Sequence, residues 1–155
     1  MYIMPVSYYS ILKNHKTMKK YIILLVLPVL LTNCTGPYTD GEYSGRSRSY
    51  YIEEPYVGMV KLYIKKGYIT NIEFEIIDTL TNEIFDENYE THFSGNKEYT
   101  EQCRKDWVGV STYPGELIKM QEIEKLDAIS GATWSYNIFT AACKKALGKA
   151  INNEE

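Results

Sequence analysis

The chain has 155 residues, 45% of them hydrophobic, so it is long enough to fold around a buried core. Four of the 17 Lys and Arg residues but none of the 20 Asp and Glu residues lie before residue 34, so the part from residue 34 onward carries a net charge of −7. This acidic balance argues against a nucleic-acid partner, because nucleic-acid phosphates select basic surfaces. It also argues against membrane contact through a polybasic surface.

Residues 1–33 have the pattern of an N-terminal export signal. Lys19 and Lys20 precede an apolar run over residues 21–31, which is short for a membrane span. The run ends in Leu-Thr-Asn-Cys, which resembles the lipobox of bacterial lipoproteins, whose Cys becomes the lipidated first residue of the mature protein. We therefore expect lipid attachment at Cys34 and a membrane-anchored domain on the periplasmic or extracellular side. The alternative is an uncleaved N-terminal anchor with Cys34 as an unmodified thiol. Residues 1–17 show no clear pattern, and Met18 is an alternative start of the protein.

The chain beyond the leader divides into a short tether and one domain. Residues 34–39 place Gly and Pro between polar residues without periodicity, which is typical of a linker. Residues 40–151 contain no repeat, and their first predicted element is a β-strand over residues 42–51. We expect one α+β domain, in which helices pack on an antiparallel β-sheet.

A β-hairpin is predicted next. Apolar and polar side chains alternate in residues 57–65 and again in residues 72–76, and Lys66-Gly67 between them predicts the turn. One face of this hairpin is therefore expected to be buried. On the exposed face, two lysines are expected to meet two glutamates across the strands: Lys61 and Lys65 with Glu73 and Glu75.

Three helices are predicted after the hairpin. Apolar residues recur at helical intervals over residues 98–110, and a second, short helix is predicted to begin at Pro114 and to include apolar residues up to Leu126. Both are expected to pack on the sheet. In residues 139–150 the apolar side chains share one face and the lysines lie off it, which predicts a long amphipathic helix.

The sequence Asp-Ala-Ile-Ser-Gly-Ala-Thr-Trp-Ser-Tyr, residues 127–136, stands at the entrance of this long helix. A helix entrance has backbone N–H groups without helical partners and the positive end of the helix dipole, so it suits a phosphate. Gly131 and Ala132 add little bulk, so a ligand can approach the backbone. The plainer interpretation is that Ser130, Thr133 or Ser135 is an N-cap and Gly131 an ordinary turn residue.

The same residues resemble the signature of the FMN-binding domain family, which includes the flavin-carrying subunits of the sodium-pumping NADH:quinone reductase and of the related Rnf complex. The signature is an acidic residue, two small or aliphatic residues, Ser/Thr-Gly-Ala-Thr/Ser, a variable residue and another Ser/Thr. It is matched by Asp127, Ser130, Gly131, Ala132, Thr133 and Ser135. In flavinylated members a separate flavin transferase attaches FMN to the Thr through a phosphoester bond, which implies attachment at Thr133. Residues 40–45 resemble the first strand of the family, and the resemblance continues to about residue 147.

The resemblance implies an apolar slot for the flavin ring and a role for the acidic residue. Trp134 and Tyr136 flank the attachment position and are the first candidates for ring contacts, followed by Trp107 and Tyr113, although each of them is alternatively a core residue. Asp127 either holds the turn through backbone N–H groups, contributes to recognition by the transferase, or is a plain exposed carboxylate.

The function implied is a membrane-anchored FMN protein that carries electrons between redox partners, rather than a complete enzyme, because no nicotinamide or substrate site is recognisable. Two alternatives remain. In one, the same fold binds FMN without a covalent bond, and Thr133 only donates a hydrogen bond to the phosphate. In the other, a cofactor-free lipoprotein binds a protein or small ligand. This second alternative is favoured by the bulky Trp134 and by Pro114-Gly115, which stands where the family has a glycine-rich segment.

The remaining reactive residues suggest no separate site. Cys103 and Cys143 could pair in an oxidising compartment, or could remain free buried thiols, which their positions on apolar helix faces favour. His92 lacks a cluster of further ligands, so a zinc site is not predicted.

Overall fold

The computed structural model describes residues 36–49 and 53–152, so the expected export signal and Cys34 lie outside the described residues. Its elements form an α+β domain in which a four-stranded antiparallel sheet has the order β1-β2-β3-β4, and this confirms the predicted fold class. In chain order the elements are β1 (Gly41–Arg48), β2 (Tyr56–Lys65), β3 (Tyr68–Asp78), β4 (Glu83–Ile84), the 3-10 helix η3 (Tyr89–Phe93), α2 (Lys97–Met120), the 3-10 helix η4 (Ile123–Lys125) and α3 (Thr133–Asn152).

The predicted hairpin is formed by β2 and β3. Lys66 and Gly67 make the turn with φ of 55° and 76°, a left-handed conformation that Gly67 adopts without a side-chain clash. The apolar residues of β2 with even numbers from Val60 to Ile64 are buried, as their alternation predicts.

The ion pairs expected on the exposed face of this hairpin differ from those observed. Lys61 lies opposite Glu73 in the register, but its ammonium group contacts Glu42 of β1 at 2.6 Å. Glu73 instead accepts a hydrogen bond from Tyr63, and Glu75 lies opposite Met59. The expectation was wrong because it considered two strands, whereas β2 has a neighbour on each side.

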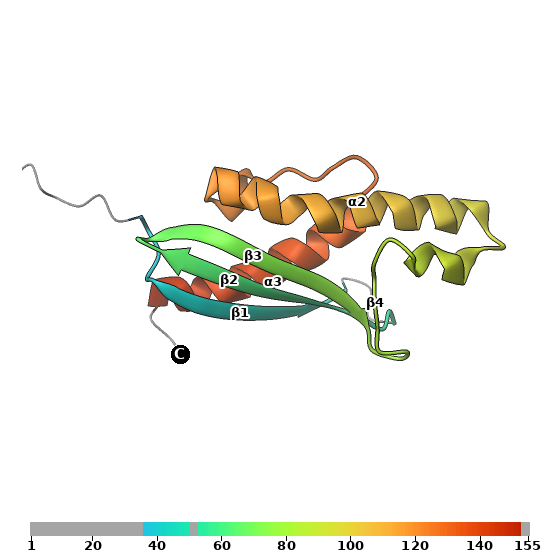
Figure 1. Cartoon of the computed structure of the whole chain (residues 1–155), viewed down its shortest axis with the longest axis horizontal. Helices are drawn as coiled ribbons and strands as arrows, with labels where there is room; N and C mark the ends of the chain where they lie inside the picture. Colours follow the sequence, from blue (N-terminus) through green and yellow to red (C-terminus); the bar gives the residue numbers. More distant parts are fainter. Residues whose placement is uncertain (1–35, 50–52, 153–155) are drawn as a thin grey trace, which may run out of the picture. The chain divides into compact units, whose positions relative to one another are not determined.

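The two long helices cover the buried face of the sheet. α3 packs against β1 and β2, and α2 packs against β3 and against α3 (Figure 1). Glycines on the sheet permit this close approach of α3. A Cβ at Gly45 would lie 2.0 Å from the carbonyl oxygen of Ala142, and one at Gly58 would lie 2.2 Å from Ile138 Cγ2. Side chains at these two positions would push α3 away from the sheet.

Helix α2 runs without interruption from Lys97 to Met120, so the first predicted helix and the start of the second are one. The second was predicted to include residues up to Leu126, but α2 ends earlier, and the separate η4 follows it. Pro114 lies inside it and cannot donate a hydrogen bond to the carbonyl of Val110. The helix nevertheless continues, because Tyr113 and Leu117 on either side of the proline are fully buried and fasten both halves to the same core. No helix within the described residues is long and apolar enough to cross a membrane.

Candidate functional site

Helix α3 begins at Thr133, so residues 130–135 form its entrance as predicted. Gly131 has a φ of 83°, which favours glycine, and a Cβ there would lie 2.7 Å from Lys105 Cδ on α2. The N–H of Ala132 donates to the carbonyl of Ile129 at 2.9 Å, and that of Tyr136 donates to the carbonyl of Ala132 at 3.1 Å. The turn before the helix is therefore closed by its own backbone.

Thr133 and Ser130 are exposed at this turn, whereas Ala132 is buried. Neither the hydroxyl nor the backbone N–H of Thr133 makes a hydrogen bond with another residue that the structure describes. The predicted attachment position thus presents a hydroxyl group to solvent at the start of a helix.

Tyr113 of helix α2 holds the turn before α3 through two hydrogen bonds of its hydroxyl group. The Tyr113 hydroxyl donates to the carbonyl of Ala132 at 3.0 Å and accepts from the N–H of Ile129 at 3.1 Å. Its ring is fully buried, so Tyr113 is a structural support and not a ring contact, contrary to one of the two expectations for it. Gly109, one turn earlier in α2, makes room for the contact between the helices, since a Cβ there would lie 2.5 Å from Ser135 Oγ.

Asp106 of α2 also contacts the start of α3. Its Oδ1 accepts a hydrogen bond from the N–H of Ser135 at 3.1 Å, and its Oδ2 accepts one from Gln102 Nε2 at 2.6 Å. The hydroxyl of Ser135 lies 3.1 Å from both Asp106 Oδ1 and the carbonyl of Ala132. Gln102 Nε2 also donates to the carbonyl of Gly131 at 2.8 Å. The Asp106 carboxylate is therefore connected directly to Ser135 and, through Gln102, to Gly131.

The Asp106 side chain is buried, with only 3% of the residue exposed. Burial raises the pKa of Asp106 above its usual value, the charge of Glu54 adds to that effect, and the hydrogen bonds from Gln102 and Ser135 oppose it. No sequence pattern indicated this residue, because its partner Ser135 lies 29 positions away on another helix.

These contacts change the expected phosphate site. From the sequence, the backbone N–H groups of about residues 131–135 were expected to bind a phosphate. In the structure, the N–H of Ala132 already donates to the carbonyl of Ile129, and the N–H of Ser135 already donates to Asp106. The N–H groups of Thr133 and Trp134 have no partner among the described residues. Ser135 itself is fully buried, so a ligand at the surface reaches the entrance through Thr133 and Trp134.

A cavity of about 430 Å³ adjoins this entrance and is lined mainly by aromatic side chains. Trp134 lies within it, with ring centroids 5.1 Å from Tyr56 and 5.2 Å from Phe85, and its Nε1 donates to Glu54 at 2.7 Å. The full lining comprises Glu54, Tyr56, Phe85, Phe93, Tyr99, Gln102, Cys103, Asp106 and Trp134. Its volume falls in the range of about 300–1,000 Å³ that is usual for cofactor pockets.

Of the four aromatic candidates for ring contacts, only Trp134 lines this cavity. Tyr136 packs on Tyr113 and donates to the carbonyl of Leu126, and Trp107 lines a separate hollow beside Arg104. The aromatic lining that sequence reasoning missed comes from β2, the segment after β4, η3 and the first turn of α2. These segments share no sequence pattern and meet only in the fold.

The other predicted site residues are more loosely placed. Asp127 is exposed, and its carboxylate makes no hydrogen bond or ion pair within the described part of the chain, so it does not hold the turn. Cys103 and Cys143 are free. Cys143 is buried as expected, whereas Cys103 is half-buried at the cavity, where burial raises its pKa to about 11. His92 Nε2 lies 3.1 Å from a carboxylate oxygen of Glu83, and residues 36–49 and 53–152 contain no cluster of metal ligands.

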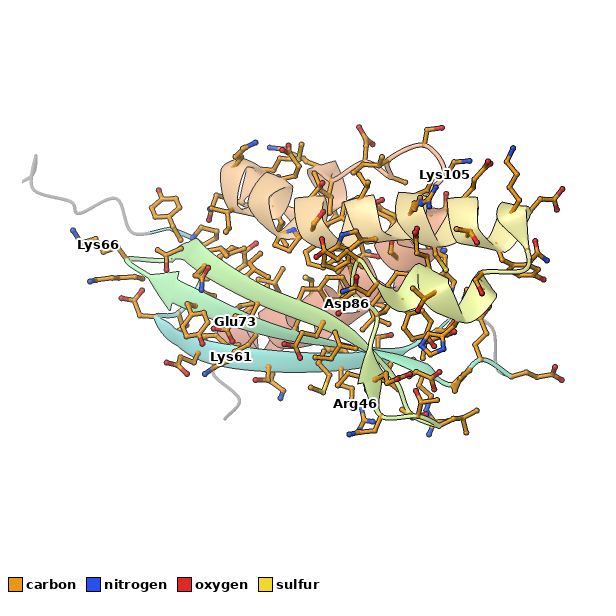
Figure 2. The ribbon with its side chains drawn as sticks, turned by 45° about the vertical axis from the view of Figure 1, so that its right-hand side comes forward. Arg46, Lys61, Lys66, Glu73, Asp86 and Lys105 are labelled. Carbon is orange, nitrogen blue, oxygen red and sulfur yellow. The ribbon has the colours of Figure 1, made fainter. Side chains whose placement is uncertain are left out.

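A second hollow, of about 520 Å³, is lined by residues of β1, β2 and β3 and by Lys149 of α3. It is lined by charged side chains that include Arg46, Lys61 and Glu73, which lie on adjacent strands (Figure 2). No aromatic residue lines it. A flat apolar ring therefore fits the aromatic cavity beside α3 better than this larger hollow.

Comparison with known proteins identifies the family. The sequence model of the FMN-binding domain matches residues 53–148, which include β2, β3, α2 and most of α3. The chain belongs to the FMN-binding domain family. No curated protein matches the chain.

Two solved structures match this chain over most of its length. A crystal structure of a Clostridium perfringens protein has a TM-score of 0.55 at 22% sequence identity, and the match covers 76% of this chain and 92% of that one. A solution structure of a Clostridium thermocellum protein has a TM-score of 0.42 at 19% identity, with 72% and 91% covered. The first supports the α+β fold.

FMN is thus the cofactor of this domain, and the residues present fit it. The aromatic cavity beside Trp134 suits the flat isoalloxazine ring, and the N–H groups of Thr133 and Trp134, which have no partner among the described residues, would be available to the phosphate. The FMN ring would supply the redox chemistry when bound, and the chain would supply its apolar surroundings.

Proposed function

We propose that this protein is a membrane-anchored, extracytoplasmic electron carrier whose FMN is joined to Thr133 by a phosphoester bond. The observation that carries the proposal is the exposed hydroxyl of Thr133, which has no hydrogen-bond partner among the described residues and directly precedes a tryptophan in the aromatic cavity. A hydroxyl in this position is accessible to a modifying enzyme, and its ester would hold the flavin next to the cavity.

The attachment is a phosphoryl transfer. Thr133 Oγ1 forms a bond to the phosphorus of the flavin phosphate and loses its proton, while the leaving group departs from the same phosphorus. Free FMN would have to release water, so the donor is an activated flavin nucleotide with a pyrophosphate bond, which releases a nucleoside monophosphate. The described residues beside Thr133 include no general base hydrogen-bonded to its hydroxyl, which agrees with catalysis by a separate flavin transferase.

The anchoring part of the proposal rests on the sequence before residue 35. The leader directs export and Cys34 receives the lipid, so that the acidic domain stands outside the cytoplasm near the membrane. Redox proteins at the membrane would then deliver electrons to the flavin and remove them. The open aromatic cavity gives the ring a site at the domain surface, where such partners can approach.

The proposal is tested by intact mass and in-gel flavin fluorescence of the full-length chain co-expressed with a flavin transferase. We expect one added FMN in the wild type, none in Thr133→Ala, and retained attachment in Thr133→Ser. Ser130→Ala is the matched control, because it removes an exposed hydroxyl from the same turn and leaves Thr133 intact. An unmodified wild type would exclude covalent attachment, and its native absorbance would then separate reversible FMN binding from a cofactor-free protein.

A further inference from the structure

We propose that Asp106 makes the entrance of α3 unfavourable for the phosphate of free FMN, so that this chain retains flavin through the covalent bond and not through phosphate affinity. This inference rests on the proposed attachment at Thr133. It concerns how the same site treats flavin that has not yet been attached.

The carboxylate of Asp106 already occupies a hydrogen-bonding position in the first turn of α3. The N–H of Ser135 points into Asp106, whose side chain is buried and receives a second N–H hydrogen bond from Gln102. The charge of Asp106 offsets the positive end of the α3 dipole, which is the field that attracts phosphate to a helix entrance. The entrance therefore carries its own anion before any ligand arrives.

The other charged groups around the entrance do not reverse this balance. Glu54 also lines the cavity and accepts a hydrogen bond from Trp134 Nε1 at 2.7 Å, so the cavity has a second carboxylate. Lys105, which Figure 2 labels on α2, packs its side chain near Gly131 but is exposed, so solvent screens its ammonium charge. The residues that line the cavity include two acids and no lysine or arginine.

Covalent attachment lowers the negative charge of the phosphate and keeps the flavin ring close to its cavity. A phosphate monoester carries about −1.5 to −2 charges at pH 7, whereas a diester with Thr133 carries one. The repulsion from Asp106 falls when the bond forms, and the ring then meets its cavity as part of the same molecule, at a high effective concentration. The two free N–H groups of Thr133 and Trp134 are sufficient for a diester that cannot diffuse away.

The test compares riboflavin with FMN, which differ by the phosphate alone. Both are titrated against the full-length chain produced without flavin transferase, and the readout is the ratio of the riboflavin Kd to the FMN Kd. In the wild type we expect a ratio near or below one. In Asp106→Asn, which keeps the shape and an acceptor for Ser135 but removes the charge and the acceptor for Gln102, we expect the ratio to rise about tenfold or more.

Two control variants test whether the charge of Asp106 itself, and not its hydrogen bond to Ser135 or a distant charge, sets the Kd ratio. Ser135→Ala removes a hydroxyl that contacts Asp106 but keeps the carboxylate and the N–H hydrogen bond of residue 135, so the ratio should rise far less than in Asp106→Asn. Glu75→Gln removes an exposed charge on the far hollow, and it should leave the ratio unchanged. If either variant raises the ratio as much as Asp106→Asn does, the role assigned to the Asp106 charge is wrong.

A measurement without substitutions gives an independent answer. Added salt screens a buried charge such as Asp106 much less than an exposed one, so the wild-type ratio should rise only slightly, and should not fall, as salt is added. A ratio of about ten or more at low salt that falls as salt is added would overturn the proposal. Neither outcome affects the mass assay, so failure of this inference is distinguishable from failure of attachment at Thr133.

Discussion

At the scale of single residues, the candidate site depends on polar side chains whose partners are distant in the sequence. Residues 130–135 were recognisable from the sequence because their chemistry lies in one continuous turn. The contacts of Asp106 and Tyr113 with that turn could not be predicted, because no local sequence pattern shows which residues of one helix will contact another. Local chemistry was therefore predictable, and its support was not.

A similar buried contact, between Asp78 and Tyr89, lies next to Tyr56, which lines the cavity. The Tyr89 hydroxyl donates to Asp78 Oδ2 at 2.7 Å and lies 3.2 Å from the hydroxyl of Tyr56, which lines the cavity. Burial favours a raised pKa for Asp78, but hydrogen bonds from Tyr89, Leu80 and Thr81 outweigh it and hold the pKa below its usual value. The contact therefore stabilises the fold in the ionised state of Asp78.

Tyr89→Phe should destabilise the protein by about 1.5–3 kcal/mol at pH 7, because it removes a hydrogen bond to a buried charged group. For an acid whose pKa is lowered by folding, the stabilisation is present above the unfolded pKa of about 3.9 and is lost as pH falls through the folded pKa. The difference between variant and wild type in urea unfolding should therefore shrink below about pH 4. A pH-independent difference would contradict this account.

The matched control for that experiment is Tyr63→Phe. Tyr63 also donates to a carboxylate, that of Glu73, but this pair lies on the exposed face of the sheet. Its loss should change the free energy of unfolding by about 0.5 kcal/mol or less, since surface interactions with carboxylates compete with water.

At the scale of elements, the strands followed from their pattern more closely than the helices did. Alternation with a period of two and the turn at Lys66-Gly67 were enough to predict β2 and β3. For α2, the local tendency of proline to begin or end a helix pointed to a break at Pro114. Burial of Tyr113 and Leu117 outweighed that tendency, and tertiary packing of this kind is not visible in a local pattern.

The contact between α2 and α3 gives an element-scale prediction. Gly109→Ala should destabilise the fold by about 1–3 kcal/mol, because the new methyl group would lie within 3.0 Å of Ser135, Tyr113 and Ala132. Thermal unfolding monitored by circular dichroism measures the loss. Flavin attachment should fall as well, because the displaced α3 entrance includes Thr133.

Gly115→Ala is the control within the same helix. A Cβ at Gly115 meets no atom within 4 Å, so this substitution should stabilise α2 by about 0.5–1 kcal/mol through its helix propensity. If both substitutions changed stability in the same direction, the close contact at Gly109 would not be the cause.

At the scale of the whole molecule, the cavity shows what sequence reasoning could not reach. The FMN-binding domain family and its cofactor followed from one short motif, since that motif is continuous. The lining of the cavity combines Tyr56 of β2, Phe93 of η3 and Tyr99 of α2 with Trp134 of α3. A site built from four elements becomes apparent only once their packing is known.

The location of the protein is the last property that can be predicted at this scale. The part from residue 34 onward has a net charge of −7, so it is repelled by anionic lipids, and its described residues contain no membrane-spanning helix. We propose that attachment to a membrane comes from the leader region, either through lipid at Cys34 or through an uncleaved anchor.

Intact mass and thiol labelling of the membrane fraction separate these two cases. We expect the wild type to lack residues 1–33, to carry an added lipid mass and to have a Cys34 that resists maleimide labelling. In Cys34→Ala the lipid mass should disappear, while flavin attachment at Thr133 persists, because the residues described in contact with the entrance of α3 lie between residues 54 and 136. A wild type that retains its leader and has a reactive Cys34 would instead establish the uncleaved anchor. The flavin domain would then be held at the membrane by a peptide segment and not by a lipid.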